Sequence, residues 1–244
     1  MEISKLAVID WGIGGFSFVS HFRKSFSTPI LYISDSGFRP YGTCSKEVLH
    51  ARLKHIFSWC FDQGASHIVV ACNAASSVLE RQPPNIVGVI AATVRRLRPL
   101  SLPNLHVIGG IQTIQSNAYG RQGLEYASAS IAQPLSALIE RGILEGEEWN
   151  SVLRDVLQPQ AEHLLLACTH YEILSFAELA TYMPNLSCIW KPSECTYDFL
   201  KEHHRFRLGK GEIEVYSTGV CAGMQNRVLR LFHVNAPPFQ SIVL

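Results

Sequence analysis

The chain has 244 residues and a formal charge of +1, because 21 Lys and Arg stand against 20 Asp and Glu. A balance this close to neutral disfavours a nucleic-acid binder, which carries a basic excess to meet phosphates. With 47% hydrophobic and 17% charged residues, the chain is too apolar to stay disordered. Its length suits one large domain or two small ones.

Membrane, secretory and disulfide-rich proteins are also disfavoured. No apolar stretch reaches the roughly 20 residues that span a bilayer, and the start, MEISKLAVID, lacks the basic and long apolar regions of a secretory signal. The seven cysteines are scattered and include no C-x-x-C pair, which argues against a disulfide framework or a zinc site. We therefore expect a cytoplasmic protein with free thiols, no bound metal, no nucleic acid and no membrane contact.

Short apolar runs alternate with stretches of helical spacing along the chain. The expected strands, in chain order, are 6–10, 29–33, 67–71, 86–90, 105–109, 163–167, 187–190 and 212–216. Helical spacing is clear at 45–63 and at 133–142. Most of the runs are rich in Val, Ile and Leu on both faces, as in parallel sheets that helices cover on both sides. The alternation predicts an α/β fold, in which ligands bind at the carboxyl ends of strands.

A weak internal repeat indicates two similar lobes. IVVACNAAS at 68–76 resembles LLLACTHYE at 164–172, and LAVIDWGIGG at 6–15 resembles LHVIGGIQTI at 105–114. The offsets of the two pairs, 96 and 99 residues, are nearly equal. We expect each lobe to be a mostly parallel sheet flanked by helices, with an active-site cleft between the lobes.

The boundary between the lobes is expected near residue 91, where several arginines and a proline interrupt the apolar pattern. The tail of the chain is expected to return to the first lobe. This predicts a first lobe of residues 1–91 plus 206–244 and a second lobe of residues 92–205.

Cys72 and Cys168 hold equivalent positions in the repeat, each after an apolar strand and before polar residues. Backbone N–H groups at a following helix N-terminus favour the thiolate form of such a cysteine. A lone cysteine there is usually small core filler, but two at matching positions of facing lobes would meet across one cleft.

Two opposed thiols suit a two-base proton transfer. One thiolate removes a proton from a stereocentre and the opposite thiol delivers another, which is feasible because the pKa of a thiol lies near working pH. Disulfide exchange is the alternative, although it usually draws on cysteines within one turn.

Four sequence blocks support the hypothesis of a two-base proton transfer. They are ID-x-G-x-GG at 9–15, D-x-x-x-R-PYGT at 35–43, ACN-x-AS at 71–76 and CTHY at 168–171. In kind and order they resemble the glutamate racemases of the aspartate/glutamate racemase superfamily. The resemblance implies two α/β lobes and a cofactor-independent enzyme that interconverts L- and D-glutamate for peptidoglycan precursor supply. It also makes a homodimer plausible, because this family commonly forms dimers.

The resemblance also implies roles for individual residues. Cys72 and Cys168 match the proton-transfer residues, with Asp10 assisting Cys72 and with His170 and Glu140 assisting Cys168. The positions that match substrate-binding residues are Asp10, Trp11, Tyr41, Gly42, Asn73, Ala74, Thr113, Thr169 and His170.

Several of these residues also have ordinary structural interpretations. Asp10 would then be a helix cap, His170 a satisfied structural histidine, Glu140 a solvated helix residue and Tyr41 part of a plain turn. The glycines that follow Asp10 are also typical of a dinucleotide-binding turn, but Ser17 stands where that motif needs its third glycine.

Two positions of the expected substrate pocket depart from the family pattern. Trp11 stands where a serine is usual, and Ala74 stands where a threonine is usual. Both departures remove a hydroxyl from the expected substrate pocket. They leave open a racemase for aspartate, for another amino acid or for a hydantoin-type substrate, and also a catalytically silent binding or regulatory homologue. The expected ligand in the leading interpretation is a small amino acid.

Overall fold

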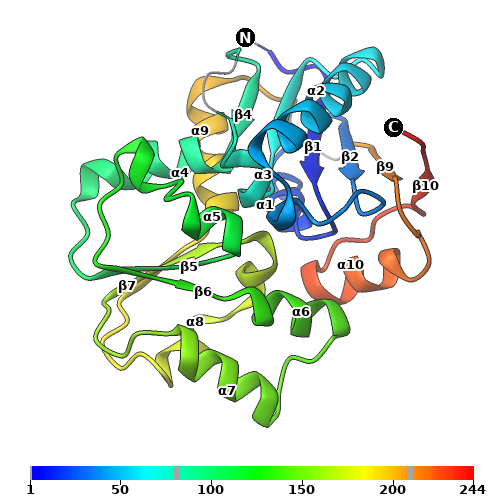
Figure 1. Ribbon diagram of the computed structural model, residues 1–244. Helices are drawn as coiled ribbons and strands as arrows, with labels where there is room; N and C mark the ends of the chain where they lie inside the picture. The colour runs from blue at the N-terminus through cyan, green and yellow to red at the C-terminus, as the bar shows by residue number, and fades with distance from the viewer. Residues whose placement is uncertain (1, 80–82, 208–210) are drawn as a thin grey trace.

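The structure, a computed structural model, describes residues 2–79, 83–207 and 211–244. It contains a six-stranded sheet in the order β10-β9-β2-β1-β3-β4 and a four-stranded sheet in the order β6-β5-β7-β8. Figure 1 shows the six-stranded sheet in the upper part of the molecule and the four-stranded sheet below it. We call each sheet with its helices the first and the second lobe. The predicted α/β fold of two helix-flanked parallel sheets is confirmed.

All eight predicted strands are present, with bounds that differ from the prediction by at most two residues. The first sheet contains β1 (Leu6–Asp10), β2 (Ile30–Ser34), β3 (His67–Val70), β4 (Ile86–Gly88), β9 (Ile213–Ser217) and β10 (Gln240–Ser241). The second contains β5 (Leu105–Gly109), β6 (Ser128–Ile131), β7 (His163–Ala167) and β8 (Cys188–Trp190). Strand β4 is shorter than expected because a helix begins directly after Gly88.

The helices cover both faces of the sheets. They are α1 (Phe16–Phe22), α2 (Lys46–Asp62), α3 (Asn73–Ser76), α4 (Val89–Leu97), α5 (Ile111–Gln115), α6 (Gln133–Arg141), α7 (Glu147–Val156), α8 (Phe176–Ala180), α9 (Pro192–His203) and α10 (Met224–Phe232). Local chemistry sets the ends of the two predicted helices. The Ser45 side chain accepts a hydrogen bond from the backbone N–H of Val48 at the start of α2, and Gly142 ends α6 with a φ of 76°.

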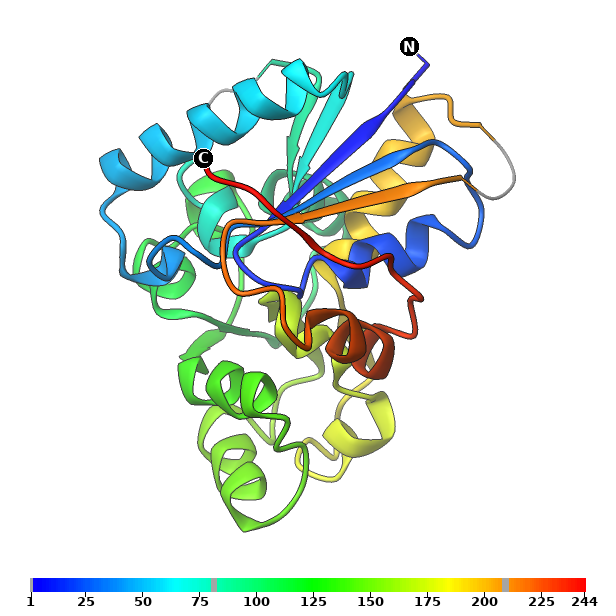
Figure 2. The ribbon, with the colours of Figure 1, turned by 90° about the vertical axis from the view of Figure 1, so that its right-hand side faces the viewer.

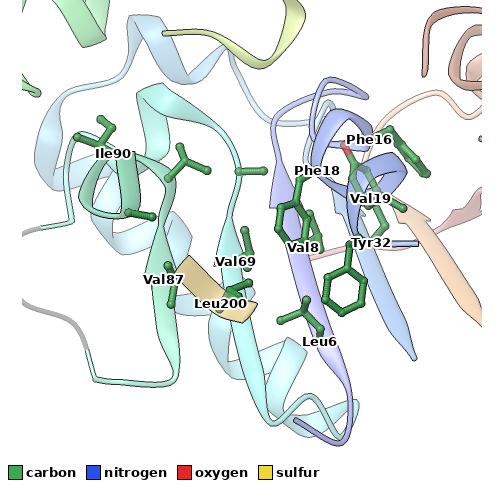
Figure 3. Close-up of a cluster of buried hydrophobic side chains, with 14 of the residues drawn as sticks. Leu6, Val8, Phe16, Phe18, Val19, Tyr32, Val69, Val87, Ile90 and Leu200 are labelled. Carbon is green, nitrogen blue, oxygen red and sulfur yellow. The ribbon is translucent and has the colours of Figure 1, made fainter. Parts of the chain in front are cut away.

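One apolar cluster joins the two lobes. It contains Leu6 and Val8 of β1, Leu105 of β5, Leu165 of β7 and Leu200 of α9. Figure 3 shows part of this cluster, with Leu6, Val8 and Leu200 among the labelled side chains. Because buried apolar surface is shared across the two sheets, the lobes are packed directly on each other.

We propose the division into residues 1–91 plus 206–244 and residues 92–205. The pairing of β9 with β2 supports it, because it returns the tail of the chain to the first sheet. Helix α4 spans position 91, so the junction lies inside a helix. Among the described residues, no helix combines the length and the apolar character needed to cross a membrane.

The parallel strands of the first sheet direct their carboxyl ends toward the second lobe. Figure 2 shows β1, in dark blue, descending from the N-terminus toward the second lobe. The residues after β1 and β3 therefore meet residues after β7, as expected for ligand-binding groups in an α/β fold.

Candidate active site

A cavity of about 380 Å³ lies where these strand ends meet. It is lined by all twelve residues that the sequence predicted for catalysis or substrate binding, namely Asp10, Trp11, Tyr41, Gly42, Cys72, Asn73, Ala74, Thr113, Glu140, Cys168, Thr169 and His170. A larger but open depression of about 670 Å³ lies over α2, around Arg52 and Trp59, and includes none of these residues. The smaller cavity is the candidate site because the titratable groups converge there.

The two cysteines enter the cavity from different lobes. Cys72 precedes α3 in the first lobe, and Cys168 precedes the short 3-10 turn Thr169–Ile173 in the second. Both side chains are half-buried and line the cavity. A ligand held between the lobes therefore meets one sulfur from each lobe.

The electrostatics of Cys72 differ from the sequence expectation, which favoured a thiolate. Burial raises the pKa of Cys72 well above its usual value, and the charges of Asp10 and Cys168 add to this rise. Hydrogen bonds from the backbone N–H groups of Ala75 and Trp11 oppose the shift but do not outweigh it. Cys72 is therefore held as a neutral thiol, the form that can give a proton.

Cys168 stands at the end of a chain of polar contacts. Its Sγ lies 3.9 Å from Nδ1 of His170, and Nε2 of His170 lies 2.5 Å from Oε1 of Glu140. Burial alone would lower the pKa of His170, but its contacts with Cys168 and Glu140 outweigh burial and raise the pKa well above the usual value. His170 is thus charged near neutral pH, and this imidazolium can stabilise a thiolate or supply a proton next to Cys168.

Glu140 is held as a carboxylate despite its partial burial. Burial raises its pKa, but the hydrogen bond and charge of His170 and the charge of Arg227 outweigh burial, and the net pKa is lowered. The interpretation of Glu140 as a solvated helix residue is wrong for this structure, since its carboxylate contacts His170.

Asp10 lies buried beneath the cavity and contacts both lobes. Its Oδ1 accepts from the backbone N–H of Trp11 at 2.8 Å, and its Oδ2 accepts from the backbone N–H of Gly15 and from Oγ1 of Thr169 at 3.1 Å. Burial raises the pKa of Asp10 and outweighs the charge of His170 and these hydrogen bonds. A carboxyl group whose pKa is raised in this way can exchange a proton near pH 7 more readily than an exposed aspartate.

Asn73 lines the cavity and carries a buried donor without a partner. Its Oδ1 accepts from the hydroxyl of Tyr119 at 2.6 Å, whereas its Nδ2 is buried and has no hydrogen-bond partner among the described residues. A buried donor without a partner costs about 1 to 3 kcal/mol. A ligand carboxylate at this place would satisfy that donor.

Tyr41 and Trp11 contribute surface rather than side-chain donors. The hydroxyl of Tyr41 donates to Oδ2 of the buried Asp35 at 2.7 Å, and the indole Nε1 of Trp11 donates to the carbonyl of Phe38 at 2.9 Å. Both polar groups are therefore committed within the protein. Ala74 offers only a methyl group, so neither Trp11 nor Ala74 offers a free side-chain donor to the cavity.

Of the cavity wall that helix α6 forms, the sequence predicted only Glu140. Helix α6 lines it with Gln133, Ser136 and Ala137 in addition to Glu140. The hydroxyl of Ser136 lies 3.9 Å from Sγ of Cys168. Helical spacing could have identified these three residues from the sequence. They precede Glu140 by seven, four and three positions and therefore share its helix face.

The remaining cavity residues also lay outside the sequence prediction. They are Pro40, Thr43, Gly110, Ile111, Gln112 and Ala167. Within residues 2–79, 83–207 and 211–244, His, Cys, Asp and Glu side chains form no group of three that could hold a metal ion.

Comparison with known proteins gives this geometry a context. No family model matches the chain. The glutamate racemase of Aquifex aeolicus is 32% identical over 241 residues, which cover 93% of each chain. Among solved structures, glutamate racemase from Thermus thermophilus, in complex with β-chloro-D-alanine, has a TM-score of 0.87 at 24% identity and covers 99% of this chain and 97% of its own.

The glutamate racemase of Francisella tularensis, solved in complex with D-glutamate, superposes with a TM-score of 0.81 at 23% identity, over 98% of this chain and 97% of its own. These two structures share the fold with this chain, and the Aquifex aeolicus sequence is similar over nearly its full length. The chain belongs to the glutamate racemase family.

Proposed function

We propose that this protein interconverts L- and D-glutamate without pyridoxal phosphate, by proton transfer between Cys72 and Cys168. The observation that carries the proposal is the convergence of the two cysteines, one from each lobe, on a single cavity. Membership of the glutamate racemase family supports the reaction and the substrate. A racemase needs a base on one face of the stereocentre and an acid on the other, and two lobes with one thiol each supply both.

The two-base reaction then runs in the following steps, with Cys168 taken as the base because charged His170 lies beside it. The thiolate of Cys168 takes the α-proton from one enantiomer, and the electron pair of the C–H bond stays on the substrate as a carbanion. The neutral thiol of Cys72 then gives its proton to the opposite face of that carbon. The enzyme is left with a Cys72 thiolate and a Cys168 thiol, which is the form that acts on the other enantiomer.

Neighbouring groups prepare each cysteine for its task. On the side of Cys168, charged His170 stabilises the thiolate, and Glu140 keeps the imidazole charged and oriented. On the side of Cys72, burial and then the charge of Asp10 raise the pKa of the thiol and so keep its proton available. Such positioned acid and base groups contribute about 10²- to 10⁴-fold each to a rate.

The substrate groups have candidate partners in the same cavity. We assign a substrate carboxylate to the unpartnered Nδ2 of Asn73. The ammonium group is assigned to the side of Asp10 and Thr169, where carboxylate and hydroxyl oxygens lie together. Gly42 and Thr113 complete the lining near the substrate.

The cellular role follows from the proposed product. D-Glutamate is a peptidoglycan precursor, so the reaction belongs to cell-wall supply. We propose a cytoplasmic location, and the free state of all seven cysteines supports it because thiols stay reduced there. A homodimer stays a prediction, which light scattering on the purified protein tests.

The decisive experiment is racemisation of L-glutamate in D2O, followed by circular dichroism and mass spectrometry. The wild type is expected to place one deuterium on the α-carbon of the product. Cys72→Ala and Cys168→Ala are expected to lower kcat by about 10²- to 10⁴-fold. Cys221→Ala is the matched control, because Cys221 is half-buried and free but lies outside the cavity.

Near-wild-type racemisation by either active-site variant would contradict the two-base assignment. Aspartate and neutral amino acids in the same assay test the effect of the departures at Trp11 and Ala74. Preferential turnover of any of these over glutamate would overturn the substrate assignment while leaving the reaction class intact.

A further inference from the structure

The cavity offers few positive charges to the two carboxylates of glutamate. The substrate carries two carboxylates and one ammonium group. No Lys or Arg stands among the residues that line the cavity in the described part of the chain. Apart from charged His170, the carboxylates must therefore be bound by neutral N–H and O–H donors, which form good hydrogen bonds to anions.

Most side-chain donors of the cavity are already committed. The indole N–H of Trp11 donates to the carbonyl of Phe38, and Oγ1 of Thr43 donates to the carbonyl of Pro40 at 2.7 Å. The hydroxyl of Ser136 donates to the hydroxyl of Tyr171 at 3.0 Å. These donors can serve a ligand only by giving up their present partners.

Asn73 supplies one unused donor, but it serves only one end of the substrate. It follows Cys72 directly in the chain, so we assign to its Nδ2 the carboxylate next to the reacting carbon. The second carboxylate of glutamate needs a donor farther from the sulfurs.

Gln133 occupies such a position. It begins α6, is exposed at the cavity, and makes no side-chain hydrogen bond within the described residues. A Cβ atom built on Gly110 would lie 3.3 Å from Oε1 of Gln133, and one built on Gly42 would lie 3.9 Å from it. The amide therefore stands over two glycine positions, one from each lobe, and rotation about χ3 turns its N–H groups toward the cavity.

The spacing along α6 matches the length of the substrate. Ser136, whose hydroxyl lies 3.9 Å from Sγ of Cys168, follows Gln133 by three residues on the same helix face. Three residues of α-helix rise about 4.5 Å. The three C–C bonds from the α-carbon of glutamate to its distal carboxyl carbon span about 4 Å.

We propose that Gln133 is a substrate-binding residue that determines specificity, and that its side-chain amide donates to the distal carboxylate of glutamate. This inference rests on the proposed function, because it assumes a dicarboxylic amino acid between Cys72 and Cys168. In this inference, helix α6 supplies a side-chain donor for the substrate, which Trp11 and Ala74 do not.

Kinetics of Gln133→Ala and Gln133→Glu with glutamate test the assignment. Gln133→Ala removes one hydrogen bond to a charged group, and we expect KM to rise about 10-fold while kcat stays within about twofold. Gln133→Glu keeps the shape but sets a carboxylate against the substrate carboxylate, and we expect kcat/KM to fall about 100-fold.

The control is Gln160→Glu, which adds the same charge at an exposed position outside the cavity and is expected to leave KM unchanged. An acidic residue in the first turn of a helix is favourable, so Gln133→Glu is expected to melt like the wild type. Loss of activity without loss of stability then points to the substrate rather than to the fold.

Two results would overturn the inference. One is a kcat/KM of Gln133→Glu within twofold of the wild-type value, and the other is a fall in kcat with unchanged KM in both variants. If the wild type racemises glutamate and either of these results is found, only the role of Gln133 is contradicted. If the wild type is inactive on glutamate, both the proposed function and this inference are contradicted.

Discussion

Thr169 and Asp10 are 159 positions apart in the chain, yet Oγ1 of Thr169 donates to Oδ2 of Asp10 at 3.1 Å. The bond joins the turn after β7 in the second lobe to the carboxyl end of β1 in the first. Both residues line the cavity that contains Cys72 and Cys168. The relative position of the two sulfurs therefore depends on a buried contact between the lobes.

The approach of Thr169 to the first lobe requires a glycine at position 14. A Cβ atom on Gly14 would collide with Oγ1 and Cβ of Thr169 and would lie 3.0 Å from Oδ2 of Asp10. We expect Gly14→Ala to lower kcat at least about 10-fold and to destabilise the protein by about 1 to 3 kcal/mol through overpacking. Steady-state kinetics and urea unfolding measure the two effects.

Gly12→Ala is the comparison for this prediction. It lies in the same turn, but its Cβ would be 3.4 Å from Oε1 of Glu140, which is ordinary contact distance. We expect a smaller loss of stability than for Gly14→Ala. Equal kcat values in Gly14→Ala and the wild type would show that the close approach of Thr169 does not matter for turnover.

The ion pair between His170 and Glu140 predicts a pH-dependent contribution to stability. The pKa of His170 is raised above its usual value of 6.5, so its contribution is complete below pH 6.5 and is lost as pH rises through the raised pKa. The pKa of Glu140 is lowered from its usual value of 4.5, so its contribution is present above pH 4.5 and is lost as pH falls through the lowered pKa. The pair therefore stabilises most between these two values.

Glu140→Gln tests this window. The Glu140 side chain is 35% exposed, which reduces the effect through solvent screening, so we expect a loss of about 1 kcal/mol near pH 5.5. The loss is expected to shrink in alkaline solution, where His170 is neutral. Urea unfolding of both proteins at pH 5.5 and at pH 10 measures it, and an equal loss at both pH values argues against the charged pair.

The sequence predicted the strands and the two cysteines because their signals are local. Runs of Val, Ile and Leu buried on both faces mark β1, β5 and β7 at their observed bounds. Strand β6 was missed because SASI alternates half-buried and exposed residues and carries two serines, as an edge strand can.

The parts of the site that could not be predicted depend on packing between distant segments. The raised pKa of Cys72 depends first on burial, which no local pattern reports. The commitment of the Trp11 indole to the carbonyl of Phe38 depends on a loop 27 positions away. The α6 wall was accessible in part, because Glu140 was predicted and its helix face follows from spacing, but only the fold shows which face meets the cavity.

Behind Tyr41, a buried ion pair supports the cavity wall. The Asp35 side chain is fully buried, and both of its oxygens accept hydrogen bonds from Arg52, at 2.9 and 2.5 Å. Arg52→Met leaves this carboxylate without its cation, and we expect a loss of about 3 to 5 kcal/mol in urea unfolding. We also expect a higher KM for glutamate, because Tyr41 donates to the same carboxylate.

Arg154→Met provides the matched control for that prediction. Arg154 pairs with Glu147 on the surface, where both side chains are mostly exposed. The expected cost of breaking such a pair is at most about 1 kcal/mol. Comparable losses for Arg52→Met and Arg154→Met would show that burial of Asp35 does not decide the energy of its ion pair.

Trp11 links the turn after β1 to the loop that carries Tyr41. Its backbone N–H donates to Asp10, and its indole N–H donates to the carbonyl of Phe38. Trp11→Phe keeps an aromatic ring at the cavity but removes the second bond, at a cost of about 1 kcal/mol. The loop that carries Tyr41 loses its hydrogen bond to the indole, whereas the hydrogen bonds around the two cysteines are unchanged. We therefore expect KM for glutamate to rise about threefold to tenfold with kcat nearly unchanged.

Trp59→Phe is the control, because Trp59 packs on Tyr216 outside this cavity. This variant is expected to leave KM unchanged. A fall in kcat with constant KM for Trp11→Phe would instead place the indole of Trp11 in the proton-transfer step, because the variant keeps the backbone bond to Asp10.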